Sequence, residues 1–485
     1  MNRNLRTAAL AGVSGVAGSY LAAGYSPAFI LAPIDAAVVR TTPGVVVAWI
    51  ITNIGEEGHL LHIGLSAAIA MALFGVIAGL GQLAADRLDR GLVGPGLAGA
   101  LSWGVTTILT SQPMFSLGAA VPVALLTLLG SGSRSTTQHD SSRRDALVSI
   151  ASALGFVAVA GGAGLFRNQT STTDGDIERP AAVTQRLSQA EEYSLDIASD
   201  NLPSLVSEIG QFYNVDIAEF DPEVPDEDWS LSFTGAVGSE RTITFEELRE
   251  RPVEHRYVTL RCVGESINGR KMDTAVWTGT PLKPLLEEVD PEGDCGCAML
   301  HAADDYFVQF PVEALDDAFL AWKMNGRPLP TAHGHPVRVL VPGHWGETNV
   351  KWLSEIELLE TEMDGYWEQR GWHGTGPVNT VTKLWADTRL EDGRIEVAGH
   401  AYAGTRGIER VEVSTDGGDT WTDAELSRRL PGEDVWRQWR HVYQPDGDHE
   451  VVVRAVDGEG TLQPQERSDS FPSGATGWVS KDISV

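Results

Sequence analysis

Cysteine is scarce in this 485-residue chain, which contains only Cys262, Cys295 and Cys297. Three thiols are too few for a disulfide framework. The Cys295-Gly296-Cys297 pair has no second cysteine pair and no nearby histidine to complete a tetrahedral zinc site, so we interpret it as a loop feature. The sequence also has no cysteine set for an iron-sulfur cluster and no haem-attachment motif. A single cysteine with a chemical role is therefore expected, and redox activity of Cys295 and Cys297 is the alternative.

Basic charge is also scarce. Asp and Glu number 66 against 36 Lys and Arg, the formal net charge is -30, and the chain has only six lysines. Such a chain lacks the basic surface that binds nucleic acid or an anionic membrane surface. Hydrated carboxylates on a lysine-poor surface are typical of proteins that stay soluble in high salt. We therefore expect no nucleic-acid partner and an acidic, halophilic surface.

The charge is distributed unevenly along the chain. Residues 1–166 carry seven acidic and eight basic side chains within long runs of Ala, Gly, Leu and Val. The rest of the chain carries 59 acidic and 28 basic side chains. At roughly 150 residues per domain, the length predicts about three units. The sequence thus predicts an apolar N-terminal part followed by a larger, acidic, soluble part.

The apolar part contains about five runs that approach the roughly 20 residues a helix needs to cross a bilayer. These runs are residues 8–31, 60–84, 92–110, 113–130 and 146–166. The fourth is short and begins at Pro113, so a count of four, with a re-entrant hairpin, stays open. The bias of Arg towards one set of loops places the N terminus in the cytoplasm. Five crossings then place the acidic part outside the cell, and four place it inside.

Arg143 and Arg144 stand directly before the last apolar run. Residues 142–147 resemble a twin-arginine export signal, which sends folded cargo across the membrane. Two stop-transfer arginines at a cytoplasmic helix end would give the same pattern. The export signal agrees with five crossings, so we expect a multi-pass protein of the cell membrane with its soluble part outside. His59 and His62 are interpreted as a polar pair at a helix end, because a bis-histidine haem needs ligands on two facing helices.

The soluble part divides by pattern. Residues 167–200 are polar and predict a tether followed by a helical approach segment. Residues 201–385 predict a mixed α+β domain, because short β-patterned runs alternate with short helical ones. The β-patterned runs are residues 230–233, 257–262 and 337–341, and the helical runs are residues 244–250 and 282–288.

Residues 386–485 show a different pattern. Alternating apolar and polar residues at 394–398, 409–414 and 450–455 are separated by Gly-containing turns. This pattern predicts an immunoglobulin-like β-sandwich. The expected fold is therefore an all-α transmembrane bundle at residues 1–166, a linker, a mixed α+β domain and a C-terminal sandwich.

Two groups of residues carry candidate chemistry. Cys262 ends a β-patterned run and precedes a Gly-containing loop, a place suited to a soft-metal ligand or a nucleophile. A free cysteine there is also common as a small buried apolar residue. His333, Arg338 and Lys351 surround a Gly/Pro-rich turn and offer donors for a phosphorylated, ring-containing ligand. Ordinary loop charges are the alternative for this second group.

Residues from about 200 to 485 resemble the sulfite oxidase family of molybdopterin enzymes, in particular its membrane-anchored prokaryotic members. The resemblance rests on the order and spacing of several short motifs. They are Phe212-Tyr213-Asn214-Val215-Asp216, Thr259-Leu260-Arg261-Cys262-Val263-Gly264, Trp277-Thr278-Gly279-Thr280-Pro281-Leu282, Met324-Asn325-Gly326-Arg327-Pro328-Leu329-Pro330, residues 333–338, Val341-Pro342-Gly343, Val350-Lys351-Trp352-Leu353 and Gly365-Tyr366-Trp367. Residues 406–408, 411–413 and 474–478 resemble the family's dimerisation domain, which implies a homodimer.

The resemblance implies a molybdenum-molybdopterin cofactor. Cys262 would be the thiolate ligand of the molybdenum, because soft sulfur suits this metal. His333, Arg338 and Lys351 match positions that hold the pterin and its phosphate. Asn214, Asp216 and Asp304 fall near other cofactor-contacting positions of the family.

The departures from the family concern the substrate. Animal sulfite oxidases place an arginine five residues after the metal-bound cysteine, where this chain has Ile267, and another near Asn214. They also place a tyrosine where this chain has Trp372. The loss of two cations weakens the case for a small dianion such as sulfite. Arg261, Arg270 or Arg370 are open as substitutes. We take Arg370 and Trp372 as candidate catalytic residues, although Trp372 also suits plain packing.

The sequence therefore predicts an outward-facing, membrane-anchored oxidoreductase that performs oxygen-atom transfer on a small oxyanion or sulfoxide. A soluble electron carrier would exchange electrons with it, because the sequence has no haem motif or cluster cysteines. Two alternatives remain. One is a reductase of sulfoxides, including oxidised methionine in exported proteins. The other is a catalytically silent surface protein that keeps the fold.

Overall fold

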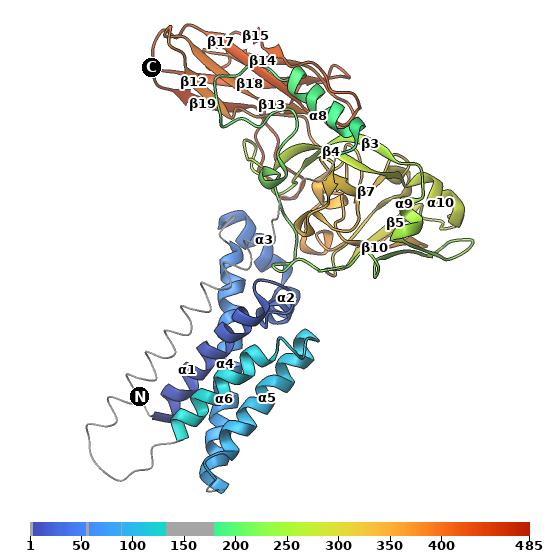
Figure 1. The fold of residues 1–485 in the computed structure, drawn as a ribbon. Coiled ribbons are helices and arrows are strands. Elements are labelled where there is room, and N and C mark those ends of the chain that lie inside the picture. The colour runs from blue at the N-terminus through green and yellow to red at the C-terminus, as the bar shows by residue number, and fades with distance from the viewer. Residues whose placement is uncertain (1–2, 55–57, 89, 132–178) are drawn as a thin grey trace. The chain divides into compact units, whose positions relative to one another are not determined.

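The computed structural model describes the whole chain except residues 1–2, 55–57, 89 and 132–178 (Figure 1). The chain divides into two compact units. The first comprises residues 1–176 and 217–222, and the second comprises residues 177–216 and 223–485. The fifth apolar run, residues 146–166, and the twin-arginine motif at residues 142–147 lie outside the described residues.

The first unit is helical. Its described helices are α1 (Arg3–Ala23), α2 (Leu31–Thr41), α3 (Gly44–Asn53), α4 (His59–Leu88), α5 (Val93–Thr110) and α6 (Leu117–Ser131) (Figure 1). Helix α1 packs against both α4 and α6. A Cβ added at Gly18 would lie 2.1 Å from the carbonyl oxygen of Gly118, so the backbones of α1 and α6 are in direct contact. Small residues permit this close packing of apolar helices.

The helices match the predicted apolar runs with differences at their ends. Helix α1 ends at Ala23 rather than at residue 31, because the chain turns at Gly24, whose φ is +68°. The short helices α2 and α3 occupy the stretch between the first two predicted runs. Among the described residues, α4 is the one helix long and apolar enough to cross a membrane, with a mean hydropathy of 2.3.

Polar side chains join elements within the helical unit. Asp35 of α2 is 2% exposed and accepts hydrogen bonds from Ser66 Oγ at 2.8 Å. His62 Nδ1 lies 2.9 Å from the same Asp35 oxygen, so His62 ties α4 to α2. Residues 217–222 join this unit through a hydrogen bond from the Tyr25 hydroxyl to Glu219 and through the Phe220 ring, 4.4 Å from that of Tyr25.

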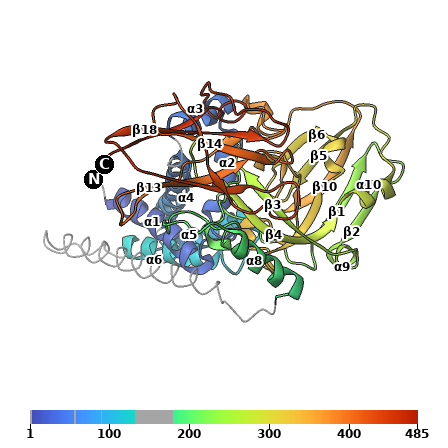
Figure 2. The same ribbon diagram turned by 90° about the horizontal axis from the view of Figure 1, so that it is seen from above.

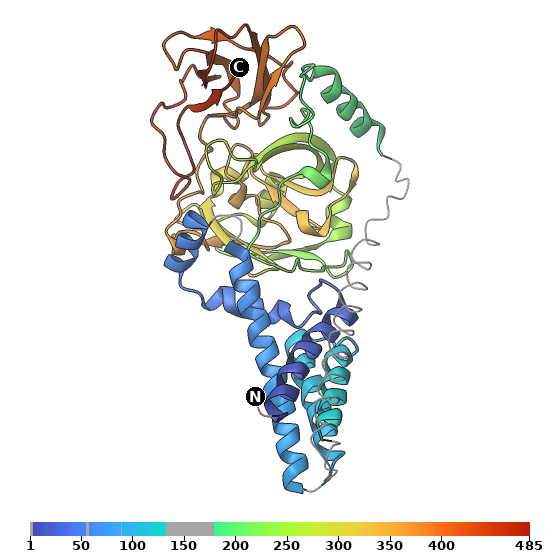
Figure 3. The same cartoon turned by 90° about the vertical axis from the view of Figure 1, so that its left-hand side faces the viewer.

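The second unit begins, in its described part, with helix α8 (Ala181–Tyr193), drawn in green beside the C-terminal strands in Figure 3. Next comes a five-stranded sheet in the order β2-β1-β10-β5-β6, whose strands lie side by side in Figure 2. The strands are β1 (Ser230–Gly235), β2 (Arg241–Thr244), β10 (Leu353–Leu359), β5 (Cys297–Ala302) and β6 (Phe307–Pro311). The β1–β10 pair is parallel and the others are antiparallel. Helices α9 (Phe245–Arg249) and α10 (Lys283–Val289) complete the layer, and Phe233, Leu285 and Ile356 belong to its core.

A second sheet of the same unit positions the candidate chemistry. Its strands are β3 (Glu254–Arg261), β4 (Met272–Pro281), β7 (Phe319–Met324) and β8 (Arg327–Pro328), with β9 (Arg338–Leu340) paired to β7. Single turns of 3₁₀ helix follow several strands. They are η2 (Ile209–Gln211), η3 (Val312–Leu315), η4 (Thr331–His333), η5 (Gly346–Thr348) and η6 (Glu368–Arg370). The predicted mixed α+β domain is confirmed, including the strands that contain residues 230–233 and 257–261.

The C-terminal part is a sandwich of two antiparallel sheets, ordered β11-β13-β17-β16 and β15-β14-β18-β19, with β12 paired to β13. The strands are β11 (Val381–Thr382), β12 (Ala386–Arg389), β13 (Ile395–Tyr402), β14 (Ile408–Ser414), β15 (Thr422–Asp423), β16 (Glu425–Leu426), β17 (Arg437–Tyr443), β18 (His449–Asp457) and β19 (Val479–Ile483). Val397, Val411 and Val453 fill the core between the sheets. The alternating pattern at residues 394–398, 409–414 and 450–455 correctly predicts β13, β14 and β18, which contribute to this core.

Cys295 and Cys297 form a disulfide, with their Cα atoms 5.3 Å apart. Cys295 lies in a loop, whereas Cys297 is the first residue of β5 and is 4% exposed. The disulfide thus joins the loop to the first residue of β5. Cys262 is the free cysteine of the described residues.

Candidate active site

Cys262 directly follows strand β3, at the start of the connection to β4. Its backbone N–H donates to the Lys271 carbonyl at 2.9 Å, which closes the loop between the two strands. Burial raises the pKa of the Cys262 thiol to about 11, and the charge of Lys271 acts in the opposite direction. Such a thiol is protonated at neutral pH and is a poor free nucleophile. It suits a metal ligand, which loses its proton when the metal binds.

A buried charged network lies under this loop. The Glu265 carboxylate accepts a hydrogen bond from Arg261 Nε at 2.9 Å and forms an ion pair with Lys383 Nζ. All three side chains are at most 1% exposed. The Lys271 N–H donates to the second Glu265 oxygen at 2.9 Å. Burial lowers the pKa of Lys383 to about 8, although Glu265 favours its charged form. The network fixes the loop that presents Cys262.

The same network removes Arg261 as a candidate for substrate binding. Besides Glu265, its guanidinium donates to the carbonyls of Asn379 at 2.8 Å and Ala475 at 3.2 Å, and it lies over the Trp345 ring. Three of its N–H groups are bonded in this way, and because the side chain is 0% exposed the guanidinium is not open to a substrate. The suggestion that Arg261 replaces a missing substrate arginine is therefore wrong.

His333 and Arg338 lie together at the η4–β9 turn, 5% and 3% exposed. Arg338 donates to the His333 carbonyl at 3.2 Å and the Asn349 carbonyl at 2.8 Å, while its buried Nε has no partner among the described residues. Burial, assisted by the charges of Arg338 and Lys351, lowers the pKa of His333 to about 4, so its ring is neutral. Burial lowers the pKa of Arg338 to about 10, which leaves the guanidinium charged at neutral pH.

Lys351 joins the acidic candidates to this turn. Its ammonium donates to Asp216 and to the Ala332 carbonyl, each at 2.8 Å, and to Asn214. Burial raises the pKa of Asp304 to about 6, and the charges of Asp216 and Lys351 both act on this carboxyl. The structure thus brings Asn214, Asp216, Asp304 and Lys351 together beside His333 and Arg338.

Tyr213 connects this cluster to Cys262. Burial raises the pKa of the Tyr213 hydroxyl well above its ordinary value, and the charges of Cys262 and Arg338 both act on it. A Cβ added at Gly346 would lie 2.7 Å from the Tyr213 hydroxyl oxygen and 3.1 Å from the Arg261 carbonyl oxygen. Tyr213 belongs to the motif at residues 212–216, but its position beside Cys262 was not predicted. Its place between two predicted site residues follows from tertiary packing.

Trp372 lies on the other side of the thiol. A Cβ added at Gly264 would lie 3.8 Å from both Cys262 Sγ and Trp372 Cη2, and Trp372 is 2% exposed. Its buried Nε1 has no hydrogen-bond partner among the described residues. Arg370 lies over the Tyr366 ring at 3.5 Å and donates to the Tyr366 carbonyl at 2.6 Å, and its buried Nε is also unpartnered in the described chain.

Two acidic residues of this region, Glu347 of η5 and Glu368 of η6, were not predicted from the sequence. Burial, with the charge of Glu368, raises the pKa of Glu347 to about 8, and burial raises the pKa of Glu368. The sequence around Glu347 mixes polar and apolar residues and gives no signal for a buried carboxyl.

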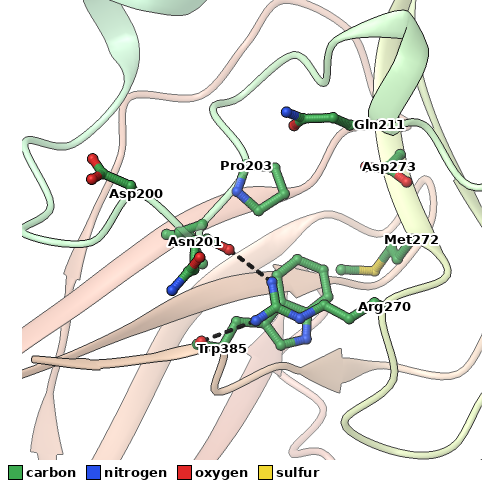
Figure 4. A pocket seen from close by; sticks show the side chains of 9 residues that line it. Asp200, Asn201, Pro203, Gln211, Arg270, Met272, Asp273 and Trp385 are labelled. Carbon is green, nitrogen blue, oxygen red and sulfur yellow. Dashed lines mark hydrogen bonds between the residues drawn. The ribbon is translucent and has the colours of Figure 1, made fainter.

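Arg270 belongs to a different place. It lines a cavity of about 200 Å³ with Asn201, Met272, Asp273 and Trp385, as Figure 4 shows. Its guanidinium donates to the carbonyls of Asn201 at 2.9 Å and Trp385 at 3.1 Å, and it lies over the Trp385 ring (Figure 4). Arg270 therefore holds together the wall of this cavity, and the suggestion that it substitutes for a substrate arginine is wrong.

The residues near Cys262 fit a molybdopterin. A soft thiol at a strand end suits molybdenum, and the buried Arg338 guanidinium keeps an unpartnered N–H for an anionic group such as a phosphate. Lys351 adds an ammonium, and His333 adds a neutral ring. Fold and site together define a molybdopterin-binding oxidoreductase.

The comparisons agree with this class. Residues 218–367 match the family model of the oxidoreductase molybdopterin binding domain, and residues 377–473 match that of the Mo-co oxidoreductase dimerisation domain. Rat mitochondrial sulfite oxidase is 27% identical over 310 residues, covering 50% of this chain and 54% of its own length. Arabidopsis thaliana sulfite oxidase is 28% identical over 302 residues, covering 49% of this chain and 77% of its own length. The chain spans about half the length of the mammalian relatives that it matches.

Among solved structures, the sulfane dehydrogenase SoxCD from Paracoccus pantotrophus shares the fold, with a TM-score of 0.51 at 19% identity. The match covers 64% of this chain and 92% of that one. The chain belongs to the sulfite oxidase family of molybdopterin-dependent oxidoreductases, and the matched domain implies a molybdenum-molybdopterin cofactor.

Proposed function

We propose that this chain is a membrane-anchored molybdenum-pterin oxidoreductase that performs oxygen-atom transfer with its catalytic part outside the cell. One observation carries the proposal. The half-buried Cys262 stands at the end of β3, and Tyr213 links it to the cluster that contains His333, Arg338 and Lys351. This combination of one soft ligand and a cationic cluster suits a phosphorylated metal cofactor.

The predicted cofactor-binding residues each have a role in this proposal. Cys262 would hold the metal, while His333, Arg338 and Lys351 would hold the pterin and its phosphate. Asn214 and Asp216 orient the Lys351 ammonium, and Asp304 lies beside it. When bound, the cofactor supplies two-electron redox chemistry, and the protein provides binding and orientation.

The membrane part supports an anchoring role. Helix α4 is 30 residues long and apolar enough to cross a bilayer. The predicted five crossings and the arginine pair at residues 143–144 favour an exterior catalytic part, served by a soluble electron carrier. The dimerisation domain at residues 377–473 favours a homodimer.

The first experiment measures molybdenum and visible absorption in the purified full chain, in C262S and in the control double variant C295S/C297S. We expect near-stoichiometric molybdenum and a thiolate-to-metal absorption band in the native chain and in the control. C262S should lose the band, because the serine oxygen is a hard ligand. A native chain without molybdenum, from a host that makes the cofactor, would favour the silent surface protein.

Export has its own test. Changing Arg143 and Arg144 to Lys should trap the protein inside the cell, because twin-arginine recognition needs the guanidinium pair. The measurement is protease accessibility of the catalytic part in intact cells. Unchanged export would leave the two arginines as stop-transfer residues.

A second candidate function is a sulfoxide reductase of the same fold. The observation that favours it is that two of the three arginines open as substitutes, Arg261 and Arg270, are bonded elsewhere, while Ile267 replaces a family arginine. Turnover of a sulfoxide with reduced dye, without turnover of sulfite with an acceptor, would support it.

A further inference from the structure

The Cys295–Cys297 disulfide is a redox-capable group that the proposed function does not use. Gly296 alone separates the two bonded residues, whose Cα atoms are 5.3 Å apart. Cys295 is half-buried in a loop, whereas Cys297 is 4% exposed at the start of β5. Gly296 is exposed, and a Cβ added to it would meet open space among the described residues. The bond therefore lies at the surface, with Cys295 more accessible than Cys297.

The loop around the disulfide keeps its shape through backbone contacts. The Gly296 N–H donates to the Gly293 carbonyl at 3.3 Å, and the Val312 N–H donates to the Gly296 carbonyl at 2.8 Å. Cys297 is also held in the β5 ladder, where it pairs with Leu359 of β10. Both sides of the ring are therefore fixed by contacts that do not involve sulfur, and the sulfur–sulfur bond can open without releasing the loop.

A bond between residues so close in sequence contributes little to stability. A disulfide stabilises a fold mainly by restricting the unfolded chain, and this effect grows with the length of the loop that it closes. The ring between Cys295 and Cys297 contains one intervening residue, so its closure removes few conformations. Exposed disulfides are also the ones that exchange readily with thiols. This bond is thus placed for opening and closing rather than for holding the fold together.

The structure accommodates the reduced form as well. Cys295 Sγ lies 3.3 Å from the Leu359 carbonyl oxygen. A thiol at this position can donate its S–H to that oxygen, whereas a disulfide sulfur has no hydrogen to donate. Cys297 packs with Met299 and Leu359 in a small apolar cluster, which suits a neutral thiol. Each reduced sulfur therefore has a suitable environment without any movement of the backbone.

The surroundings of the disulfide are acidic. Glu292 and Asp294 precede it and are both exposed. Glu360, also exposed, follows the β10 residue that pairs with Cys297. Residues 290–298 contain no Lys, Arg or His. Exposed charges of one sign attract molecules of the opposite sign and repel those of the same sign. A thiol reagent that carries positive charge should therefore reach this disulfide fastest.

We propose that the Cys295–Cys297 disulfide is a thiol–disulfide exchange site that takes two electrons from an external dithiol with cationic surroundings. One thiolate of the dithiol attacks Cys295 Sγ, the sulfur–sulfur bond breaks, and Cys297 leaves and takes up a proton. The second thiolate of the dithiol then attacks its own sulfur in this mixed disulfide, and Cys295 leaves as a thiol. The partner is oxidised to a disulfide, the pair is reduced to two thiols, and the two protons of the dithiol pass to the pair.

The test uses the purified full chain and three small dithiols of different charge, namely cationic dithiobutylamine, neutral dithiothreitol and anionic dihydrolipoate. Alkylation followed by mass spectrometry counts the thiols at neutral pH in the folded chain. Cleavage after Lys and Arg places Cys262 in the peptide 262–270, apart from Cys295 and Cys297. Each rate is divided by the rate of the same dithiol with a small neutral disulfide, which removes differences in intrinsic thiol reactivity.

We expect the native pair to be reduced on the order of minutes and to re-form in glutathione disulfide. The normalised rate should be about threefold or more higher for the cationic than for the anionic dithiol, and KCl should reduce this difference. The double variant D294N/E360Q should lose the preference. E459Q, which removes an exposed charge from the C-terminal part, is the control and should keep it.

Single variants test which sulfur is attacked. C297S leaves Cys295 as a free thiol, and C295S leaves Cys297. We expect Cys295 to react with iodoacetamide and with glutathione disulfide about tenfold or more faster than Cys297, because access limits the buried thiol. Equal rates, or a faster Cys297, would contradict the assignment of Cys295 as the attacked sulfur.

Thermal unfolding separates exchange from a structural role. The reduced chain and C295S/C297S should each melt within about 4 °C of the native chain, because the closed ring is so short. A larger fall, or a pair that stays oxidised until the chain is denatured, would overturn the inference. The readout is thiol content, so a chain without molybdenum whose pair still exchanges would contradict the proposed function and leave this inference intact.

Discussion

Around Cys262, individual buried charges are held by individual partners. Glu265 lies between Arg261 and Lys383, and Arg338 is fixed by two backbone carbonyls. Burying an ion is costly unless a partner compensates it, so each of these residues is sensitive to the loss of its partner. The effect of a substitution at this scale depends on the charge that it leaves behind.

Glu265 and Lys383 differ in this respect. E265Q leaves two buried cations, Arg261 and Lys383, without an anion, whereas K383M leaves a neutral Arg261–Glu265 pair. We expect E265Q to cost about 3–5 kcal/mol of stability and K383M clearly less. Denaturant unfolding followed by tryptophan fluorescence measures both. An equal loss in the two variants would show that packing, rather than charge, sets the cost.

Glu347 predicts a pH dependence of stability. Its pKa of about 8 in the folded protein is above the ordinary value of 4.5, so the folded state keeps a proton that the unfolded chain releases. The contribution to stability is complete below pH 4.5 and is lost as the pH rises through 8. We therefore expect the thermal midpoint of the native chain, relative to E347Q, to fall over this interval. Parallel curves for the two proteins would contradict it.

At the scale of elements, the site is built where strands end. Cys262 follows β3, while the turn between η4 and β9 carries His333 and Arg338, and η5 and η6 carry Glu347 and Glu368. Short 3₁₀ turns let the chain reverse at once and bring side chains from distant strands together. The geometry of these turns should therefore control cofactor binding more than the strands do.

Gly334 tests this at the η4–β9 turn. Its φ is +104°, and an added Cβ would lie 3.0 Å from the Cα of Lys351. Gly393 has a φ of +85° but open space around its Cβ position. We expect G334A and G393A each to lose about 1 kcal/mol from backbone strain. Only G334A should also lose molybdenum, measured by elemental analysis. A molybdenum content of G334A equal to that of the native chain would show that this turn does not control cofactor binding.

At the scale of the whole molecule, the net charge of -30 dominates behaviour in solution. Salt screens repulsion between exposed carboxylates over about 10 Å at 0.1 M and less at higher concentration. The compact state should gain most from this screening, because it holds the charges closest together.

We therefore expect the thermal midpoint to rise with KCl from dilute buffer into the molar range. Scanning calorimetry or fluorescence melting of the full chain in detergent measures it, with sucrose at matched water activity as the control. Full stability in dilute buffer, without further gain in KCl, would contradict a halophilic surface.

The sequence determined the classes of structure and the chemical groups of the cofactor region. Alternation along residues 394–398 and 450–455 predicts strands, and β13 and β18 form there, although β13 is buried along its whole length. Cys262, His333, Arg338 and Lys351 stand in short motifs, so order and spacing were enough to find them. The helical run at residues 60–84 likewise predicts α4, because an apolar stretch of this length has few other uses.

Only the tertiary structure decided which of these groups are free to act. Glu265 and Lys383 are 118 residues apart, and no local pattern predicts their pairing. Glu265 also binds Arg261 and keeps its guanidinium from contacting a substrate. The carbonyls of Asn201 and Trp385 hold the guanidinium of Arg270 in the same way. Glu347 and Glu368 become a pair only because η5 and η6 meet in the fold. Burial and partners set the charge of an ionisable group, and both depend on contacts between segments that are distant in the sequence.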